Sequence, residues 1–145
     1  MKKGVDYIGV GCGCLIVNDQ YQVLLIKRKD KSQWGGGWLW SQPGGAIEFG
    51  EHIEDAIKRE IKEELNVDVE LFGPKLYAED ITTKDWITKH WFIWARFAKI
   101  TWWEIKLMEP EKHEAAEWFD LDKLPTTLTA YTLPYIEAYK ERLKK

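Results

Sequence analysis

Cysteine is scarce in this chain, which holds only Cys12 and Cys14 among its 145 residues. The two stand two positions apart in a run that reads as a strand, so their side chains share one face and cannot easily bridge each other. With no further cysteine, they cannot form a zinc site either. We therefore expect two small core residues with free thiols, in a protein of a reducing compartment.

Long apolar runs and excess positive charge are absent too. No stretch approaches the roughly 20 apolar residues that a membrane-spanning helix needs. Residues 1–4 are not followed by the apolar segment of a signal peptide. The formal net charge of −3 argues against a surface that coats nucleic acid, although a local basic site for phosphate is compatible with it. We expect a cytoplasmic protein that binds neither a membrane nor a nucleic-acid polymer.

The composition that is present fits a soluble globular protein. Apolar residues make up 45% of the chain and charged residues 31%, and the sequence shows no repeat, low-complexity tract or linker. We expect residues 1–145 to form a single domain with a substantial core. Nine tryptophans are unusual for this length, and several of them fall in stretches that resemble loops.

An amphipathic helix is predicted for Ile53–Leu65. Its apolar residues recur at the helical period and form one stripe: Ile53, Ala56, Ile57, Ile61 and Leu65. Glu60, Glu63 and Glu64 are spaced i, i+3 and i+4, so the three carboxylates emerge on neighbouring turns of another face and repel one another. A cation among them would remove this repulsion, and three hard oxygen ligands suit Mg²⁺ or Mn²⁺.

The residues before the helix add to this pattern. Pro43-Gly44-Gly45 is a turn whose glycines let the backbone approach a ligand closely. An ordinary helix with a solvated acidic face would not also carry this turn, Glu51 and Arg59 in register. The whole stretch resembles the Nudix box, the signature of hydrolases that cleave a nucleoside diphosphate linked to another group. The matching residues are Gly45, Glu51, Arg59-Glu60-Ile61, Glu63-Glu64 and Val67.

The resemblance implies roles for individual residues. Glu60, Glu63, Glu64 and the Gly44 carbonyl would hold the metal, and the general base would be Glu63 or, outside the box, Glu114. Arg28, at the end of a strand, would contact substrate phosphate because its guanidinium binds oxyanions bidentately. For Glu114, as for Glu111, a solvated acidic loop is the other interpretation.

Three further box residues are assigned a supporting role. We expect Arg59 and Glu51 to hold helix and loop together through an ion pair, next to Gly45. Asn66 replaces the usual Gly after the helix; Asn tolerates the left-handed conformation that ends a helix, so we expect the geometry to persist. His52 replaces a capping Ser or Thr, and the acidic first turn compensates in part.

The remaining chain predicts strands and one more helix. An α/β/α sandwich around a mixed, partly curled sheet fits this order of elements, as the Nudix resemblance also implies. Strands are expected at 7–17, 22–27, 38–40, 46–49, 67–72, 75–80, 90–98 and 115–120, with a turn at 73–74 and a polar hairpin loop at 81–89. The last helix is expected over residues 132–144, with Tyr135, Ile136, Tyr139 and Leu143 buried.

The substrate expected from the resemblance is a nucleoside triphosphate, cut between its α and β phosphates. The fragments KLMEPEKHE and EWFDLDKLP resemble those of MutT-like pyrophosphatases, in particular the MutT homologue two subgroup, which also suggests a homodimer. Aromatic rings can stack on a base, and the candidates for base contacts are Trp34, Trp102 and Trp103. Ala115 and Ala116 would leave room beside the base.

Two other functions are compatible with the sequence. The box selects the reaction and not the leaving group, so ADP-ribose or another nucleotide sugar is an alternative substrate. A Nudix-like module that senses a nucleotide without cleaving it is the other alternative, against which the intact carboxylates argue.

Overall fold

The computed structural model describes residues 1–29 and 38–145. Along the chain the elements are β1 (Gly9–Val17), β2 (Gln22–Arg28), β3 (Trp40–Ser41), β4 (Gly44–Ala46), α1 (Ile53–Leu65), β5 (Asp68–Lys84), β6 (Ile87–Trp102), β7 (His113–Asp120) and α2 (Leu133–Leu143). Among these described residues no helix is long and apolar enough to cross a membrane.

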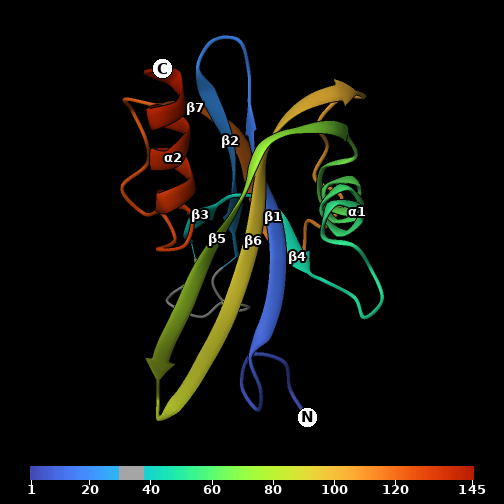
Figure 1. Ribbon diagram of the computed structural model, residues 1–145, viewed down its shortest axis with the longest axis vertical. Coiled ribbons are helices and arrows are strands. Elements are labelled where there is room, and N and C mark those ends of the chain that lie inside the picture. The colour runs from blue at the N-terminus through green and yellow to red at the C-terminus, as the bar shows by residue number, and fades with distance from the viewer. Residues whose placement is uncertain (30–37) are drawn as a thin grey trace.

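The strands of the described ranges form one mixed sheet. Its main path runs β3-β2-β1-β6-β5, while β4 pairs with β1 and β7 pairs with β2. The β1–β6 pair is parallel, and β1 forms the expected antiparallel hairpin with β2. Helices α1 and α2 cover opposite faces of the sheet (Figure 1). The predicted α/β/α sandwich with a mixed sheet is therefore confirmed.

Two apolar layers hold the sandwich together. The layer under α1 includes Ile57, Ile61 and both cysteines, which are buried and free as predicted. The layer under α2 includes Ile136 and Tyr139 of that helix. Because strand side chains alternate between faces, each inner strand supplies residues to both layers.

Helix α1 begins and ends where the apolar period predicted. His52 precedes it without a side-chain capping bond, and two acidic residues lie in the first turn. At its other end Asn66 has φ 63° and ψ 26°, and its N–H donates to the Lys62 carbonyl. The left-handed ending expected from Asn is therefore confirmed.

The prediction was wrong for the region between the two long strands. Strand β5 continues through residues 73–74, because a register shift between Phe72 and Leu76 accommodates Gly73 and Pro74. Proline is tolerated at such an irregularity in an edge strand. The expected loop 81–89 shrinks to a tight turn at Asp85 and Trp86, both with positive φ. Long strands β5 and β6 therefore form a hairpin that extends past both helices (Figure 1).

Smaller differences concern the ends of elements. β3 begins at Trp40, because Trp38 has φ 67° and leaves the extended conformation. β4 covers the glycine turn instead of residues 46–49. β6 is longer at both ends than the predicted 90–98, and many of its side chains are only half-buried. In α2, Leu143 is 41% exposed and not buried, because it lies at the end of the helix.

Candidate active site

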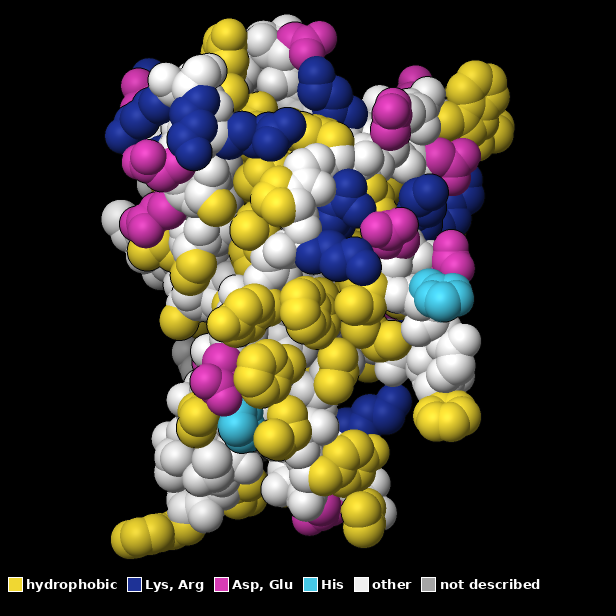
Figure 2. All heavy atoms as spheres, in the orientation of Figure 1, with side chains coloured by type: hydrophobic (Ala, Val, Ile, Leu, Met, Phe, Trp, Pro, Cys, Tyr) yellow, Lys and Arg dark blue, Asp and Glu magenta, His cyan; other side chains and the backbone are white. Residues whose placement is uncertain are grey.

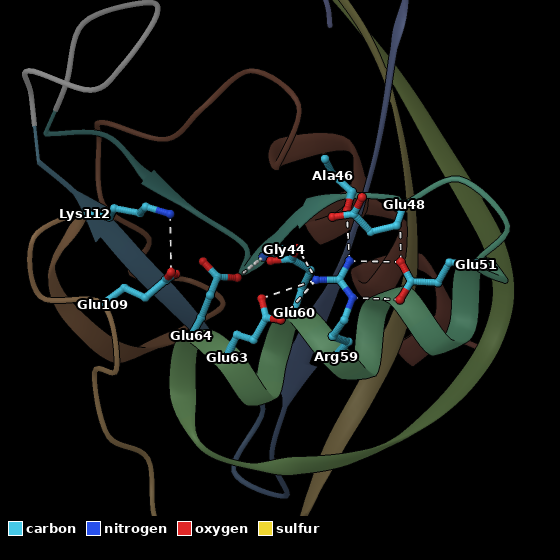
Figure 3. Close-up of polar contacts among 10 residues, drawn as sticks. All are labelled: Gly44, Ala46, Glu48, Glu51, Arg59, Glu60, Glu63, Glu64, Glu109 and Lys112. Carbon is cyan, nitrogen blue, oxygen red and sulfur yellow. Dashed lines mark hydrogen bonds and ion pairs between the residues drawn. The ribbon is translucent and has the colours of Figure 1, made fainter.

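Helix α1 carries the acidic face of the site. Glu60, Glu63 and Glu64 project from neighbouring turns toward the strand that holds Gly44 (Figure 3). Their burial differs: Glu64 is buried with 4% of its surface exposed, Glu60 is half-buried, and 52% of the Glu63 side chain is exposed. The face therefore runs from the protein interior to solvent, with a carboxylate at each level.

The glycine turn packs directly on these carboxylates. The Gly44 N–H donates to Glu64 Oε1 over 2.7 Å. A Cβ on Gly45 would clash with the Glu60 carboxylate, and a Cβ on Gly44 would clash with the Cys12 carbonyl. Glycine is thus required at both positions because strand β4 lies between β1 and the acidic face of α1.

Arg59 connects this face with the loop before the helix. Its guanidinium makes two bonds to Glu51, at 2.7 and 2.9 Å, and one to the Ala46 carbonyl at 3.1 Å. Its third nitrogen faces Glu60 at 2.9 Å and Glu63 at 3.3 Å. The ion pair expected between Arg59 and Glu51 is present, and the same cation lies against two carboxylates of the box.

Burial and mutual repulsion affect the ionisation of this site. The pKa of Glu60 is raised, first by burial and then by the neighbouring Glu64 and Glu63, while Arg59 acts in the opposite direction. Burial, with a further contribution from Glu60, raises the pKa of the Cys12 thiol to about 12. One arginine does not balance three crowded carboxylates, so the donor set fits a divalent cation bound by oxygen.

A second segment reaches the same carboxylates from the C-terminal side. Glu109, in the loop before β7, and His113, the first residue of β7, lie with Glu64 in a group whose potential ligand atoms are all within 4.8 Å of one another. His113 Nε2 is 3.1 Å from Glu64 Oε2, and both side chains are buried. Neither residue was predicted as a site residue from the sequence, although Glu111 and Glu114 of the same acidic loop were.

The backbone fixes this segment against the helix. The Met108 N–H donates to the Glu64 carbonyl, and the His113 N–H donates to the Glu109 carbonyl, each over 3.0 Å. Glu114, which the sequence suggested as a base, forms a different contact. Its carboxylate lies 3.7 Å from Lys27 Nζ, and of the β7 residues it is His113 that joins Glu64.

A cavity of about 350 Å³ adjoins the glycine turn. Its walls come from β1, β2, the β4 turn, the β5–β6 hairpin and the segment before α2, and they include Arg28, Gln42, Gly44 and Gly45. The Arg28 Nε and both amide atoms of Gln42 are buried and have no hydrogen-bond partner within the described ranges. Buried polar atoms are costly without a partner, and these three are shut off from solvent, so they are not among the polar groups that face the cavity.

Two of the candidate base contacts do not line this cavity. Trp102 and Trp103 line a separate hollow beside Asn66. Ile93, at the cavity wall, is nine residues from Trp102 on β6, so the two lie about 30 Å apart along the strand. The cavity is lined instead by Trp91 and Tyr131.

The other three predicted base contacts are Ala115, Ala116 and Trp34. Ala115 packs in the layer under α2 and Ala116 in the layer under α1. Trp34 lies outside the described residues.

Comparison with known proteins identifies the domain. The sequence profile of the NUDIX domain matches residues 8–139. The chain belongs to the Nudix family. The Nudix domain is that of hydrolases that act on pyrophosphate bonds, and the box that signals it is the turn, loop and helix described above.

Several relatives and solved structures resemble this Nudix chain. It is 30% identical over 127 residues to "Putative nudix hydrolase 1" of Caenorhabditis elegans, a match to 86% of this chain and 31% of that protein. It is 40% identical over 72 residues to "Nucleoside triphosphatase NudI" of Escherichia coli, covering 48% of this chain and 50% of that protein. The matched region makes up half or less of the length of each of these two curated relatives.

Solved Nudix structures match over nearly the whole chain. The MutT NUDIX hydrolase from Burkholderia pseudomallei is 33% identical, with a TM-score of 0.74 over 90% of this chain and 97% of that chain. The MutT protein from Methanosarcina mazei has a TM-score of 0.78 at 23% identity, over 95% and 96% of the two chains. At that identity the second match supports the fold alone.

Proposed function

We propose that this Nudix protein is a Mg²⁺- or Mn²⁺-dependent pyrophosphohydrolase of (deoxy)nucleoside triphosphates, which releases a monophosphate and pyrophosphate. One observation supports it most directly: the same two glycines line the cavity and contact the acidic face of α1. A nucleoside in the cavity therefore has its phosphates beside Glu60 and Glu64. The nucleoside-binding cavity and the metal-binding carboxylates would then lie on either side of Gly44 and Gly45.

The size and lining of the cavity favour a single nucleoside. A volume of about 350 Å³ is near the lower end of ligand pockets, which range from about 300 to 1,000 Å³. The rings of Trp91 and Tyr131, which line the cavity, offer apolar surface for a base. Arg28, at the wall, provides a positive charge for phosphate.

The chain's own residues have distinct tasks in the proposed reaction. Glu60, Glu63, Glu64 and the Gly44 carbonyl would hold the metal, which neutralises phosphate charge and lowers the pKa of a water when bound. A water attacks phosphorus, its proton passes to a carboxylate, and the bond to the bridging oxygen breaks to release pyrophosphate. Glu63 is exposed enough to accept that proton, and Glu114, beside Lys27, is the alternative base.

The relatives support a triphosphate substrate without deciding it. The E. coli relative is named a nucleoside triphosphatase, and the fragments at 106–114 and 117–125 resemble the MutT homologue two subgroup. A nucleotide sugar such as ADP-ribose remains the second candidate, because the box does not select the leaving group. The retained carboxylates argue against a sensing module without activity.

Assembly and compartment complete the proposal. We propose a homodimer because apolar side chains are exposed together on one face of the β5–β6 hairpin and β1. Figure 2 shows hydrophobic side chains gathered across this face. The free, buried thiols of Cys12 and Cys14 fit a reducing compartment such as the cytoplasm.

The test is product analysis with a panel of nucleoside triphosphates and ADP-ribose, each with Mg²⁺ and with Mn²⁺. We expect monophosphate and pyrophosphate in equal amounts from at least one triphosphate, faster than ribose phosphate appears from ADP-ribose. The reverse order of rates would move the assignment to nucleotide sugars. Release of inorganic phosphate in place of pyrophosphate would contradict the cleavage position.

A further inference from the structure

One face of the β5–β6 hairpin contributes polar side chains to the cavity beside the glycine turn. Asp80 and Thr82 of β5 and Lys89 and Trp91 of β6 all line this cavity. Asp80 lies directly opposite Trp91 in the antiparallel pair, and Thr82 lies directly opposite Lys89. Residues opposite each other in such a pair project to the same face of the sheet. The cavity wall therefore contains a carboxylate beside an indole ring.

The indole ring of Trp91 has a fixed place at this wall because it packs over two glycines. Gly9 of β1 is the partner of Trp91 in the parallel β1–β6 pair. A Cβ on Gly9 would lie only 2.6 to 2.7 Å from three atoms of the ring, and a Cβ on Gly4 would lie even closer to it. The ring thus occupies the space that a side chain at either position would fill. Bases stack on such aromatic rings.

The strand pairing sets the distance between this ring and the glycine turn. Gly9 pairs with Trp91, whereas Cys12, three residues further along β1, pairs with Gly45. β4, β1, β6 and β5 lie side by side in the sheet (Figure 1). Three residues of a strand span roughly 10 Å. A base beside Trp91 and Asp80 therefore leaves room for a sugar between itself and phosphates at Gly45.

The Asp80 carboxylate is oriented by its neighbour and can still accept further hydrogen bonds. The Thr82 hydroxyl donates to Asp80 Oδ1 over 3.1 Å. An ionised carboxylate has about four acceptor sites and no donor, so one such bond leaves both oxygens able to accept. Asp80 is half-buried, and a ligand that fills the cavity must replace the hydrogen bonds to water that its carboxylate loses.

We propose that Asp80 selects guanine by accepting hydrogen bonds from its N1–H and its 2-amino group while the base stacks on Trp91. Guanine presents these two donors side by side on one edge. Adenine and cytosine present one amino group next to a ring acceptor, and in uracil and thymine two carbonyls flank the single N–H. A carboxylate, which only accepts, therefore pairs with two groups of guanine and meets an acceptor on each of the other bases. The inference rests on the proposed nucleotide function and names the base.

Binding of two monophosphates that differ only at the 2-position of the base tests this contact. Guanosine 5′-monophosphate carries the 2-amino group, and inosine 5′-monophosphate lacks it. Calorimetry with the full-length protein and Mg²⁺ measures both affinities without turnover, since neither ligand contains an anhydride bond. We expect the wild type to bind guanosine monophosphate at least about tenfold more tightly, because the inosine ligand lacks a hydrogen bond to a charged group.

Replacement of Asp80 should change the preference and not only weaken binding. In Asp80→Asn the amide has a donor group as well as an acceptor. Xanthine has a carbonyl in place of the 2-amino group of guanine, so it fits such an amide. We expect Asp80→Asn to lose the preference for guanosine over inosine monophosphate and to bind xanthosine 5′-monophosphate more tightly than the wild type does.

Asp85→Asn is the matched control. It makes the same chemical change in the tight turn at the tip of the hairpin, where residue 85 has φ 52°. Asparagine tolerates this left-handed conformation as aspartate does. We expect Asp85→Asn to bind all three monophosphates as the wild type does.

Equal affinity of the wild type for guanosine and inosine monophosphate, or binding of neither, would overturn the inference. A folded Asp80→Asn with the wild-type preference would do the same. The wild-type comparison decides even if the variant fails to fold. Cleavage of triphosphates with no preference for guanine over hypoxanthine would refute the role of Asp80 and leave the proposed function standing. Selective binding of guanosine monophosphate by a protein that cleaves no nucleotide would do the reverse.

Discussion

At the scale of single residues, Arg59 joins the parts of the site that the chain brings together. It binds Glu51 in the loop and the Ala46 carbonyl in the turn, and it faces Glu60 and Glu63 on its own helix. The pKa of Glu51 is lowered, mainly by its hydrogen bond to Arg59. The pKa of the Arg59 guanidinium is raised by the same bond. The pair therefore stays charged over a wide range of pH.

Replacement of Glu51 by Gln should destabilise the fold in a pH-dependent way. A carboxyl whose pKa is lowered in the folded state stabilises it above the unfolded pKa of about 4.3. That contribution is lost as the pH falls through the lowered folded-state value. We expect Glu51→Gln to melt below the wild type near neutral pH and the difference to vanish in acid.

Thermal unfolding of both proteins across this pH range checks the prediction. Glu70→Gln, which removes an exposed carboxylate on β5, is the matched control and should change little. A difference in melting temperature between Glu51→Gln and the wild type that is the same at every pH would show that the ion pair is not its cause.

Residue positions were predictable from the sequence where they share one regular element. The spacing of Glu60, Glu63 and Glu64 follows from the helix alone, so their common face could be predicted. Glu109 and His113 join Glu64 only because the loop after β6 returns along α1, and no local period encodes that path. The sequence pattern indicates the acidic loop but not which of its side chains points inward.

At the scale of elements, the C-terminal end of α1 depends on the backbone conformation of Asn66. Asn66 adopts the left-handed conformation, and its N–H bonds to the Lys62 carbonyl. This ending turns the chain directly into β5, and the backbone of residues 106–108 also bonds to the last turn of α1. The geometry at residue 66 thus helps to hold the loop that carries Glu109.

Substitutions at Asn66 should separate conformation from side-chain chemistry. A β-branched residue in the left-handed region costs about 1–2 kcal/mol, so Asn66→Val should lower the free energy of unfolding by that amount. Asn66→Gly should keep or slightly raise it, because glycine adopts this conformation without strain. Chemical denaturation of the three proteins gives these differences, and equal stability of the Val and Gly variants would contradict the account.

An element whose apolar residues recur at a regular period was predicted well, whereas elements rich in polar or turn-forming residues were not. The apolar stripe of α1 predicted both ends of the helix correctly. In the β5–β6 hairpin, Gly73-Pro74 and the polar stretch 81–89 are typical of loops. Yet the strands continue, because pairing between β5 and β6 satisfies the backbone and the irregularity at Phe72 absorbs the proline. Such pairing partners are set by the tertiary fold, which local propensity does not report.

At the scale of the whole molecule, the hairpin presents an apolar surface. Tyr77, Ile81 and Val10 are 62%, 58% and 43% exposed. Their partners across the strands, Trp94, His90 and Phe92, alternate along β6 on the same face. His90 pairs there with Glu79, so one ion pair interrupts the apolar surface. Contiguous exposed apolar surface in a soluble protein marks an interaction site, and a second copy of the chain is the partner we propose.

Sedimentation at micromolar concentration tests the dimer. We expect the wild type to sediment as a dimer and the double variant Val10→Ser/Tyr77→Ser to shift toward the monomer. Tyr21→Ser removes an equally exposed ring (61%) in the β1–β2 turn and should leave the dimer intact. A wild-type monomer at this concentration would end the proposal.

The central claim is that the carboxylates of α1 hold a cation that the reaction requires. Pyrophosphate release from the preferred triphosphate, measured with Mg²⁺, with Mn²⁺ and with excess chelator, tests it most directly in the wild type and in Glu64→Gln. Stabilisation by a bound cation is worth several kcal/mol, and about 1.4 kcal/mol corresponds to a tenfold rate. We predict a loss of roughly two orders of magnitude or more in chelator and in the folded variant. Full turnover under either condition would contradict the account.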